Sequence, residues 1–514
     1  MKISKLVQQE KLKPQIVISV RNLVEFLLNA GDIDDRHGGR MRMEAMQEGS
    51  RMHRKIQRRA GADYHAEIPL KFIITYEDYD LAIEGRADGI IYEEALLEEM
   101  SHFIDDASEQ EAESPVSQIL IDEIKGVYFD VEKMTEPNPV HLAQAKCYAF
   151  IFATQNHLPR IGVQMTYCNM DTEEIRRFQE YYSYEEIEAW FLEMIAEYKR
   201  WSDFLFHHNM IRQQSIRGLE FPYAYREGQK KLVTDVYRSI MREKTLFLQA
   251  PTGTGKTLAT VFPAIQAMGQ NIGNKIFYLT AKNATGVVAH DTFLLMGQQG
   301  YEGKTVVLTA KDKMCLLEER ACNPEECPYA KGHFDRVNDA VFDILQEEYM
   351  IDRECILRWA KERRVCPFEY SLDIASWVDH IICDYNYVFD PNVCLKRFFA
   401  EGIRGDYIFL VDEAHNLVER ARDMYSETLI KEEFLVMKKK LKVYGKKLES
   451  TLERCNRELL AYKRTCEGLS VLYEMDSFLF ALMRAAAAMD ELLQREGNII
   501  DREEVLEFYF KVRN

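Results

Sequence analysis

The sequence of 514 residues lacks any run of about 18 apolar residues, the length that a membrane-spanning helix requires. Its first residues, MKISKLVQQEKLKPQ, lack the apolar segment of a secretory signal peptide. An excess of positive charge is also lacking, because the formal net charge is −18. That charge argues against a globally basic nucleic-acid binder but allows a local basic channel. These absences predict a cytoplasmic protein that does not bind membranes.

The chain has enough apolar residues for real cores, since 47% of its residues are hydrophobic. Its length predicts roughly three domains. Eleven cysteines are present, and a cytoplasmic chain does not use its thiols for a disulfide framework. The cysteines therefore need another explanation.

The stretch FLQAPTGTGKTLATV, residues 247–261, carries the strongest motif. Residues 245–248 predict a buried strand that ends in a Gly-rich turn, and a helix is predicted to open at Lys256 and Thr257. The glycines let backbone amides point at a polyphosphate. Lys256 reaches the β- and γ-phosphates, and the Thr257 hydroxyl ligates Mg²⁺. The sequence thus predicts an ATP–Mg²⁺ site at Gly253, Thr254, Gly255, Lys256 and Thr257.

A second nucleotide element is predicted in GDYIFLVDEAHNLVERA. The apolar residues 407–411 predict a buried strand that brings Asp412 and Glu413 to the edge of a sheet. Asp412 is predicted to hold Mg²⁺ through water, and Glu413 to polarise the attacking water.

Four cysteines lie between these two elements. Cys315, Cys322 and Cys327 occur in MCLLEERACNPEECPYAKG, and Cys366 follows in VCPFEYSL. Four thiolates at these separations could hold Zn²⁺ or a [4Fe–4S] cluster, and the spacing alone does not choose. Four ordinary reduced thiols are the remaining alternative. The other cysteines of this half are scattered and predicted to be inert.

The first 205 residues predict a separate unit. Helices are predicted over residues 16–29, opening at Ser19, and over residues 41–59. Alternating apolar segments predict strands of one mixed sheet at residues 65–75, 79–93 and 117–130. The acidic residues 93–117 predict a solvated loop.

Polar residues of this unit are placed as a metal site requires. Asp88 lies near the end of one strand, and Glu123 and Lys125, two residues apart on the next, share a sheet face. A carboxylate on each strand can hold a divalent cation, and the lysine can orient the attacking water. Gln144 and Tyr148, four apart in HLAQAKCYAF, share a helix face.

With His53 on the predicted helix before them, these residues resemble the RecB-type branch of the PD-(D/E)XK nucleases, over roughly residues 15–205. The alternatives are a structural αβ domain with a solvated Glu–Lys pair, or a nuclease fold without activity. The cysteines of the iron–sulfur nuclease relatives are absent. The resemblance implies that His53, Asp88 and Glu123 bind Mg²⁺ or Mn²⁺. It implies that Lys125 is the catalytic lysine, and that Gln144 and Tyr148 contact DNA or organise the site.

The order AxTGxGKT, four cysteines, DEAHNL resembles the XPD/DinG family of superfamily 2 helicases, over residues 220–514. The resemblance implies a [4Fe–4S] cluster on the four cysteines, and ATP hydrolysis coupled to movement along single-stranded DNA and opening of forked DNA. It implies that His415 couples the nucleotide site to the DNA site. Arg226 and Gln229 would grip the adenine or position the nucleotide; the alternative is the polar first turn of an exposed helix.

The predicted fold is α/β. A PD-(D/E)XK nuclease-like αβ domain spans residues 1–205, and a RecA-like P-loop NTPase domain spans residues 206–310 and 381–425. An iron–sulfur domain is inserted at residues 311–380, and a helical arch starts in residues 426–514. Motifs of a second RecA-like domain are not found. We therefore expect a fragment, an interrupted reading frame, or half of a split pair whose second domain is supplied by a separate chain.

The predicted function is an ATP-dependent DNA helicase of the XPD/DinG type with an N-terminal metal-dependent DNA exonuclease, acting in DNA repair. One alternative is a metal-dependent nuclease with an inactive nucleotide-binding module. The other is a non-catalytic DNA-binding fragment. Phosphate release stimulated by DNA distinguishes the helicase from the nuclease with an inactive nucleotide-binding module. The absence of both DNA cleavage and ATP hydrolysis favours the non-catalytic fragment.

Overall fold

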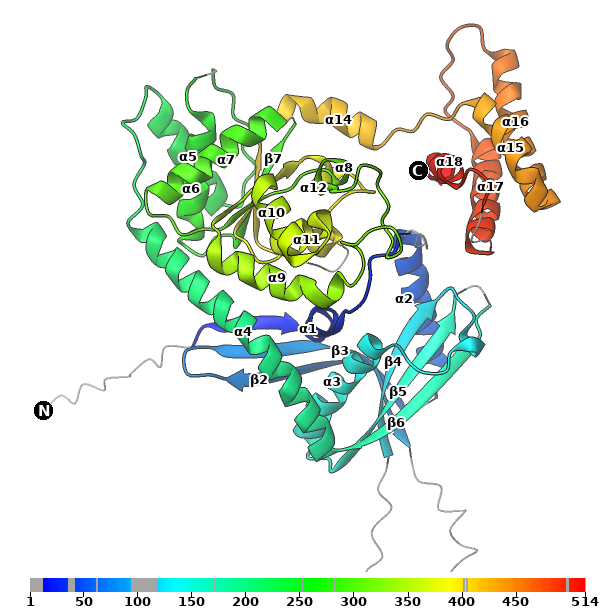
Figure 1. The fold of residues 1–514 in the computed structure, drawn as a ribbon, viewed down its shortest axis with the longest axis horizontal. Helices are drawn as coiled ribbons and strands as arrows, with labels where there is room; N and C mark the ends of the chain where they lie inside the picture. The colour runs from blue at the N-terminus through cyan, green and yellow to red at the C-terminus, as the bar shows by residue number, and fades with distance from the viewer. Residues whose placement is uncertain are drawn as a thin grey trace, which may run out of the picture. The chain divides into compact units, whose positions relative to one another are not determined.

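A computed structural model describes residues 13–35, 42–61, 63–93, 118–170, 172–251, 253–281, 283–400, 403, 405–495 and 499–513. Most of the predicted acidic loop, residues 94–117, lies outside this range. The chain forms two compact units (Figure 1). The first contains residues 1–279, 283–383 and 405–410, and the second contains residues 280–282, 384–404 and 411–514. In the described residues, no helix combines the length and the apolar character needed to cross a bilayer.

The first unit begins with a six-stranded mixed sheet in the order β1-β3-β4-β5-β6, with β2 paired to β3 outside this path. β1 and β3 are parallel, as are β4 and β5, and the other pairs are antiparallel. The predicted mixed sheet is therefore confirmed. Its strands are β1 (Gln15–Ser19), β2 (Tyr64–Thr75), β3 (Asp80–Glu93), β4 (Gln118–Val127), β5 (Arg160–Asn169) and β6 (Ile175–Ser183).

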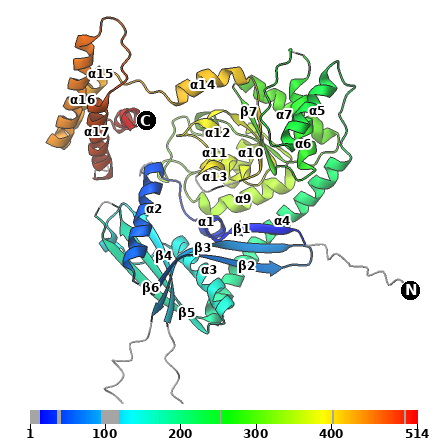
Figure 2. The same cartoon turned by 180° about the vertical axis from the view of Figure 1, so that it is seen from behind.

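The domain that contains this sheet has four helices in its described part and a short 3-10 helix, Val131–Lys133. The four helices are α1 (Val20–Leu28), α2 (Arg42–Arg59), α3 (Pro139–Asn156) and α4 (Tyr184–Arg217). Figure 2 shows α3 against the sheet, where it packs on β4 and β5. The Ser19 hydroxyl accepts a hydrogen bond from the Asn22 amide at 3.1 Å, so helix opening at Ser19 is confirmed. Residues 16–18, predicted as helix, are instead strand. Their backbone groups pair with β3, which sequence periodicity does not reveal.

A five-stranded sheet with the order β11-β7-β10-β8-β9 follows, and β10, β8 and β9 run parallel. Its core includes Ala259, Ile265, Ile276 and Tyr278. The strands are β7 (Lys275–Thr280), β8 (Thr305–Val307), β9 (Met350–Ile351), β10 (His380–Asp384) and β11 (Tyr407–Val411). The helices are α5 (Gln229–Met241), α6 (Lys256–Met268), α7 (Asn283–Gln298), α8 (Lys311–Met314), α9 (Phe334–Glu347), α10 (Arg353–Arg363), α11 (Pro367–Ala375), α12 (Asn386–Phe389) and α13 (Lys396–Phe399).

The strand predicted at residues 245–248 was wrong. These residues lie outside the five-stranded sheet, and Phe247 is 90% exposed. A strand needs a neighbour to take its backbone hydrogen bonds, and local apolar character does not reveal whether that neighbour is present.

Besides residues 280–282 and 384–404, which include α12 and α13, the second unit contains the chain from the last residue of β11 onward. A 3-10 helix (Ala414–Asn416) precedes α14 (Leu417–Met424), and four longer helices follow, with a 3-10 turn at Lys442–Tyr444. These helices bury their own core, which includes Phe434, Leu452 and Phe508. The predicted helical character of residues 426–514 is confirmed for the described part. The helices are α15 (Lys431–Leu441), α16 (Lys446–Thr465), α17 (Asp476–Arg495) and α18 (Arg502–Arg513).

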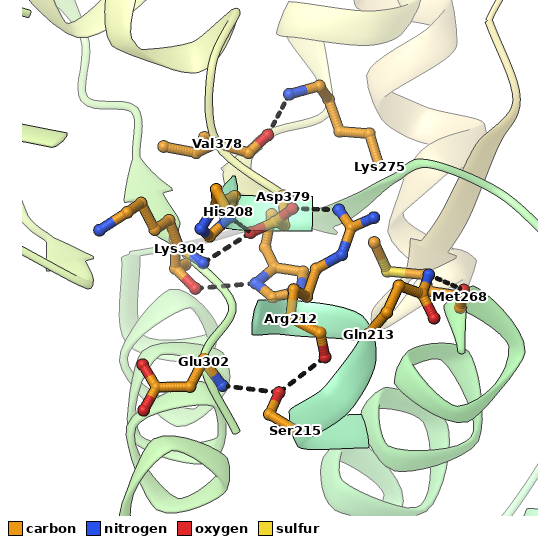
Figure 3. A network of polar contacts seen from close by, with 12 residues as sticks. His208, Arg212, Gln213, Ser215, Met268, Lys275, Glu302, Lys304, Val378 and Asp379 are labelled. Carbon is orange, nitrogen blue, oxygen red and sulfur yellow. Dashed lines mark hydrogen bonds and ion pairs between the residues drawn. The ribbon is translucent and has the colours of Figure 1, made fainter. Parts of the chain in front are cut away.

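Within the first unit, α4 joins the two sheets through a buried ionic cluster, which we call the Asp379 joint (Figure 3). His208 Nε2 lies 2.7 Å from Asp379 Oδ2, and the Arg212 guanidinium donates to Oδ1. The Lys304 amide, just before β8, donates to Oδ2 at 2.8 Å. Burial alone would raise the pKa of Asp379, but the charges of His208 and Arg212 hold it well below its usual value. The Asp379 carboxylate therefore stays ionised where α4 meets the five-stranded sheet.

Candidate functional site

The predicted phosphate loop leads directly into α6. Gly253 and Gly255 have φ values of 80° and 72°, the left-handed region that favours glycine. Gly255 is the N-cap of α6, and it makes no side-chain cap hydrogen bond to the first turn of the helix. Lys256 and Thr257 form the first turn, half-buried. The loop thus has the backbone shape and helix N-terminus that bind an anion.

Arg226 and Gln229 contact this loop. The Arg226 guanidinium donates to the carbonyl of Gly253, and Gln229 Nε2 donates to that of Thr254 at 3.0 Å. Gln229 Oε1 accepts from the Arg226 amide at 3.0 Å, which fixes the two residues together. A Cβ at position 255 would lie 2.7 Å from Gln229 Nε2, so a larger residue there would displace the Gln229 amide from the loop. Both residues therefore hold the loop backbone.

In the second unit, the DEAH residues follow the end of β11. Glu413 adopts a left-handed backbone with φ 48°, and its amide donates to Asp412 Oδ1 at 3.0 Å. The Tyr385 hydroxyl donates to the carbonyl of Asp412. His415 Nδ1 lies 3.3 Å from Glu413 Oε2. A left-handed non-glycine residue is strained and is typical of functional sites. Sequence reasoning missed Tyr385, which carries no motif of its own.

The four predicted cysteine ligands line one cavity. Its wall includes Cys315, Cys322, Cys327 and Cys366, together with apolar neighbours such as Leu317 and Phe368. None of the eleven cysteines is joined to another by a disulfide in the structure. Cys355, also buried, does not line the cavity. The fold therefore gathers four distant cysteines around one space.

Two features of the cavity concern the fourth cysteine. The Cys366 amide donates to His333 Nδ1 at 3.1 Å, so His333 carries its proton, when neutral, on Nε2. Burial raises the pKa of the Cys366 thiol to about 11 and also raises that of Cys322. At neutral pH such thiols stay protonated unless a cation, such as a bound metal, stabilises the thiolate.

In the N-terminal sheet domain, the predicted polar residues are linked to one another by a chain of hydrogen bonds and ion pairs. Lys125 Nζ donates to Glu123 Oε1 at 2.8 Å and to Gln144 Oε1 at 3.0 Å. Gln144 lies on α3, which crosses the sheet at this point, and Tyr148 one turn later is hydrogen-bonded to its side chain. The face of β4 that carries Glu123 and Lys125 therefore packs against the face of α3 that carries Gln144 and Tyr148.

Asp88 and His53 complete this set from β3 and α2. Asp88 Oδ2 accepts from the Ile124 amide at 2.8 Å, which fixes it beside Glu123. His53 Nδ1 lies 3.5 Å from Asp88 Oδ1. Burial alone would lower the pKa of His53, but contact with Asp88 raises it overall. Sequence reasoning missed Gln57, whose Nε2 donates to the Asp88 carbonyl at 3.0 Å. Its spacing of four from His53 is the signal that could have identified it.

Glu123 is the most unusual group of the set. Burial and then the negative charge of Asp88 raise its pKa to about 7, although Lys125 opposes the shift. Its Oε2 is buried and has no hydrogen-bond partner. A buried carboxylate oxygen without a partner requires a proton or a cation.

Across the described ranges, no three His, Cys, Asp or Glu side chains lie close enough together to hold a single metal ion. At the N-terminal site, Lys125 donates a hydrogen bond to Glu123 Oε1, so this oxygen already has a protein partner and is not directed at a shared metal position. At the cysteine cavity, all four cysteines are part of the wall.

Known helicase families match the C-terminal part of the chain. Residues 226–315 match the DEAD/DEAH box helicase family, and residues 302–434 match the DEAD_2 family. The first range contains the phosphate loop, and the second contains the four cysteines and the DEAH residues. The α/β architecture with a parallel sheet fits the RecA-like fold of such domains.

Named relatives point in the same direction. A "Regulator of telomere elongation helicase 1 homolog" from Oryza sativa subsp. japonica is 24% identical over 272 residues, 42% of this chain and 26% of that protein. The XPD/RAD3 helicase subunit of the "General transcription and DNA repair factor IIH" from Saccharomyces cerevisiae is 23% identical over 232 residues, 38% of this chain and 29% of that protein. A solved structure, "Truncated XPD", has a TM-score of 0.35 and 16% identity over 55% of this chain and 82% of that chain.

This chain spans about a quarter of the length of the curated relatives that it matches. Residues 226–434 are thus similar to two helicase families, and the chain is similar to named helicases.

Proposed function

We propose that this chain is the nucleotide- and DNA-engaging part of an ATP-dependent DNA helicase of the XPD/DinG type, acting on single-stranded and forked DNA. The observation that carries the proposal is the phosphate loop at the N-terminus of α6, held by Arg226 and Gln229 within the matched helicase region. Backbone amides bind the polyphosphate of ATP, Lys256 neutralises its terminal phosphates and Thr257 ligates Mg²⁺. Asp412 holds Mg²⁺ through water and Glu413 orients the attacking water.

Replacing Lys256 by alanine is the experiment that tests this proposal. We expect Mg²⁺-dependent binding of a fluorescent ATP analogue to weaken about 10- to 150-fold, because hydrogen bonds to charged groups contribute about 1.5–3 kcal/mol. Lys244→Ala, on an exposed lysine before the loop, is the matched control and leaves binding unchanged. Equal affinity of wild type and Lys256→Ala would exclude the phosphate-loop assignment. Release of phosphate stimulated by single-stranded DNA then distinguishes a helicase from an inert nucleotide-binding module.

We further propose that Cys315, Cys322, Cys327 and Cys366 hold a [4Fe–4S] cluster, because all four line one cavity. A bound cluster supplies a rigid cross-link and a redox-active centre. The chain contributes the rest: the apolar wall excludes water, and the His333 imidazole fixes the backbone of Cys366. Cys366→Ser is expected to remove most iron from the purified protein, measured by elemental analysis and visible absorbance. Cys355→Ser is the matched control and retains it. Zinc in place of iron in wild type would contradict the cluster.

We also propose a second activity, a metal-dependent DNA nuclease in the N-terminal sheet domain. The observation in its favour is the continuous set from His53 through Asp88, Glu123 and Lys125 to Gln144, and the orphan Glu123 Oε2. In the structure the side chains of His53, Asp88 and Glu123 do not converge on one point, so they would have to turn toward one another to hold Mg²⁺ or Mn²⁺, which would supply Lewis acidity and a more acidic bound water. Lys125 orients the attacking water, and Gln144 holds Lys125 in place, with Tyr148 behind it.

A further inference from the structure

Residues 31–35, between α1 and α2, leave the N-terminal sheet domain and pack on the cysteine-bearing loop; we call them the strap. Gly31 has φ 92°, so it turns the chain away from α1 with a backbone that favours glycine. Its amide donates to Asp335 Oδ1 at 2.7 Å, and its carbonyl accepts from the Phe334 amide at 3.0 Å. The strap is thus fixed at its first residue.

The rest of the strap pairs with the loop that carries the second and third cysteines. The Ile33 amide donates to the carbonyl of Ala330 at 3.0 Å, and the Asp35 amide donates to that of Cys322 at 2.9 Å. Between them, Asp32 Oδ1 accepts from the Gly332 amide at 2.5 Å. Alternate amides are therefore used, as on one edge of a strand.

Two strap side chains reach the cavity and its rim. Ile33 is 7% exposed, packs with Cys327 and Ala330, and is part of the cavity wall. Asp35 Oδ2 lies 2.7 Å from Lys311 Nζ. Lys311 also lines the cavity and is hydrogen-bonded to the Cys322 thiol. One residue of the strap therefore closes the cavity, and another neutralises the cation beside it.

We propose that the strap is a built part of the cluster site: Ile33 shields the cluster from solvent, Asp35 sets the charge around it, and a loaded cluster in turn holds the strap in place. The N-terminal domain would thereby be fastened to the helicase region through the cluster. This inference rests on the cluster of the proposed function.

The first test measures how fast the full chain loses iron to a coloured iron chelator. We expect Ile33→Ser to accelerate iron release by about 10-fold or more, because it admits water to an apolar wall. Ile73→Ser, on an exposed isoleucine of β2, is the matched control and leaves the rate unchanged. Equal rates for Ile33→Ser and wild type, with iron bound in both, would overturn the shielding role. A wild type without iron would instead refute the proposed cluster itself.

The second test measures the midpoint potential of the cluster, which a purely structural role would not move. Asp35→Asn removes a negative charge beside Lys311 and is expected to raise the potential, since net charge near a cluster sets it. Asp339→Asn is the control, because Asp339 on α9 forms an exposed ion pair with Arg200 of α4; this variant leaves the potential unchanged. An unchanged or lowered potential in Asp35→Asn would overturn the charge-setting role.

The reverse coupling is tested by hydrogen exchange of the strap amides before and after iron is removed. The amides of Gly31, Ile33 and Asp35 donate to the cysteine region, so they should exchange slowly in the loaded chain and faster in the chelated one. The Asn22 amide, bonded within α1, is the internal reference and should not change. Equal exchange of the strap amides in both states would show that the cluster does not hold the strap.

Discussion

Lys125→Ala is expected to slow metal-dependent DNA cleavage by about 10²- to 10⁴-fold, the range for loss of a positioned proton-transfer group. Lys125 Nζ contacts both Glu123 and Gln144, so its loss leaves a buried carboxylate without its cation. The measurement is the initial rate of cleavage of end-labelled single-stranded DNA by the full chain with Mn²⁺ and without ATP. Gln144→Ala should weaken cleavage less, because it positions Lys125 rather than touching the substrate.

Lys133→Ala is the matched control for this experiment, because that lysine lies on the same domain with a side chain that is 83% exposed. Its cleavage rate should equal that of wild type, and a contaminating nuclease would be revealed by cleavage that persists in Lys125→Ala. No cleavage by a folded, iron-loaded wild type would contradict the nuclease proposal. The N-terminal domain would then be a DNA-binding domain without catalytic activity.

The N-terminal site was predictable because its signals are local. Glu123 and Lys125 are two apart on a strand, and Gln144 and Tyr148 are four apart on a helix, so each pair shares a face wherever the element lies. Pairing of β3 with β4 then brings Asp88 beside Glu123, through its bond to the Ile124 amide. Periodicity alone predicts these two pairs, and the resemblance to the nuclease family joins them with His53 and Asp88 in one set.

Features that depend on distant partners were not predictable in this way. Residues 245–248 have the apolar character of a strand, yet the sheet of the described chain does not include them. Residues 16–18 have helical periodicity, yet pairing with β3 makes them a strand. The contact of Asp32 with Gly332 spans 300 residues, and no local pattern marks it. In each case the outcome depends on whether a distant backbone partner is present, which local preference does not reveal.

Asp379→Asn is expected to destabilise the first unit by about 3–5 kcal/mol, the cost of leaving a buried cation without its partner. Arg212 and His208 face this carboxylate from α4, and all three side chains are less than 10% exposed. The unfolding transition of the first unit in urea measures the loss. Asp339→Asn, an exposed pair with Arg200, is the control and changes stability by less than about 0.5–1 kcal/mol. Asp379→Leu combined with Arg212→Met should recover part of the loss, because a buried pair can be replaced by apolar packing.

The pH dependence separates loss of charge from loss of shape. The pKa of Asp379 lies well below its ordinary value of 3.8, so its contribution is present above pH ~4 and lost as pH falls through the lower, folded-state pKa. The stability gap between wild type and Asp379→Asn should therefore narrow as the pH is lowered below about 4. A gap that stays constant there would mean that the asparagine perturbs packing rather than charge. A gap that is absent at neutral pH would mean that α4 is held to β10 by its apolar contacts alone, and that the Asp379 joint fixes geometry without contributing stability.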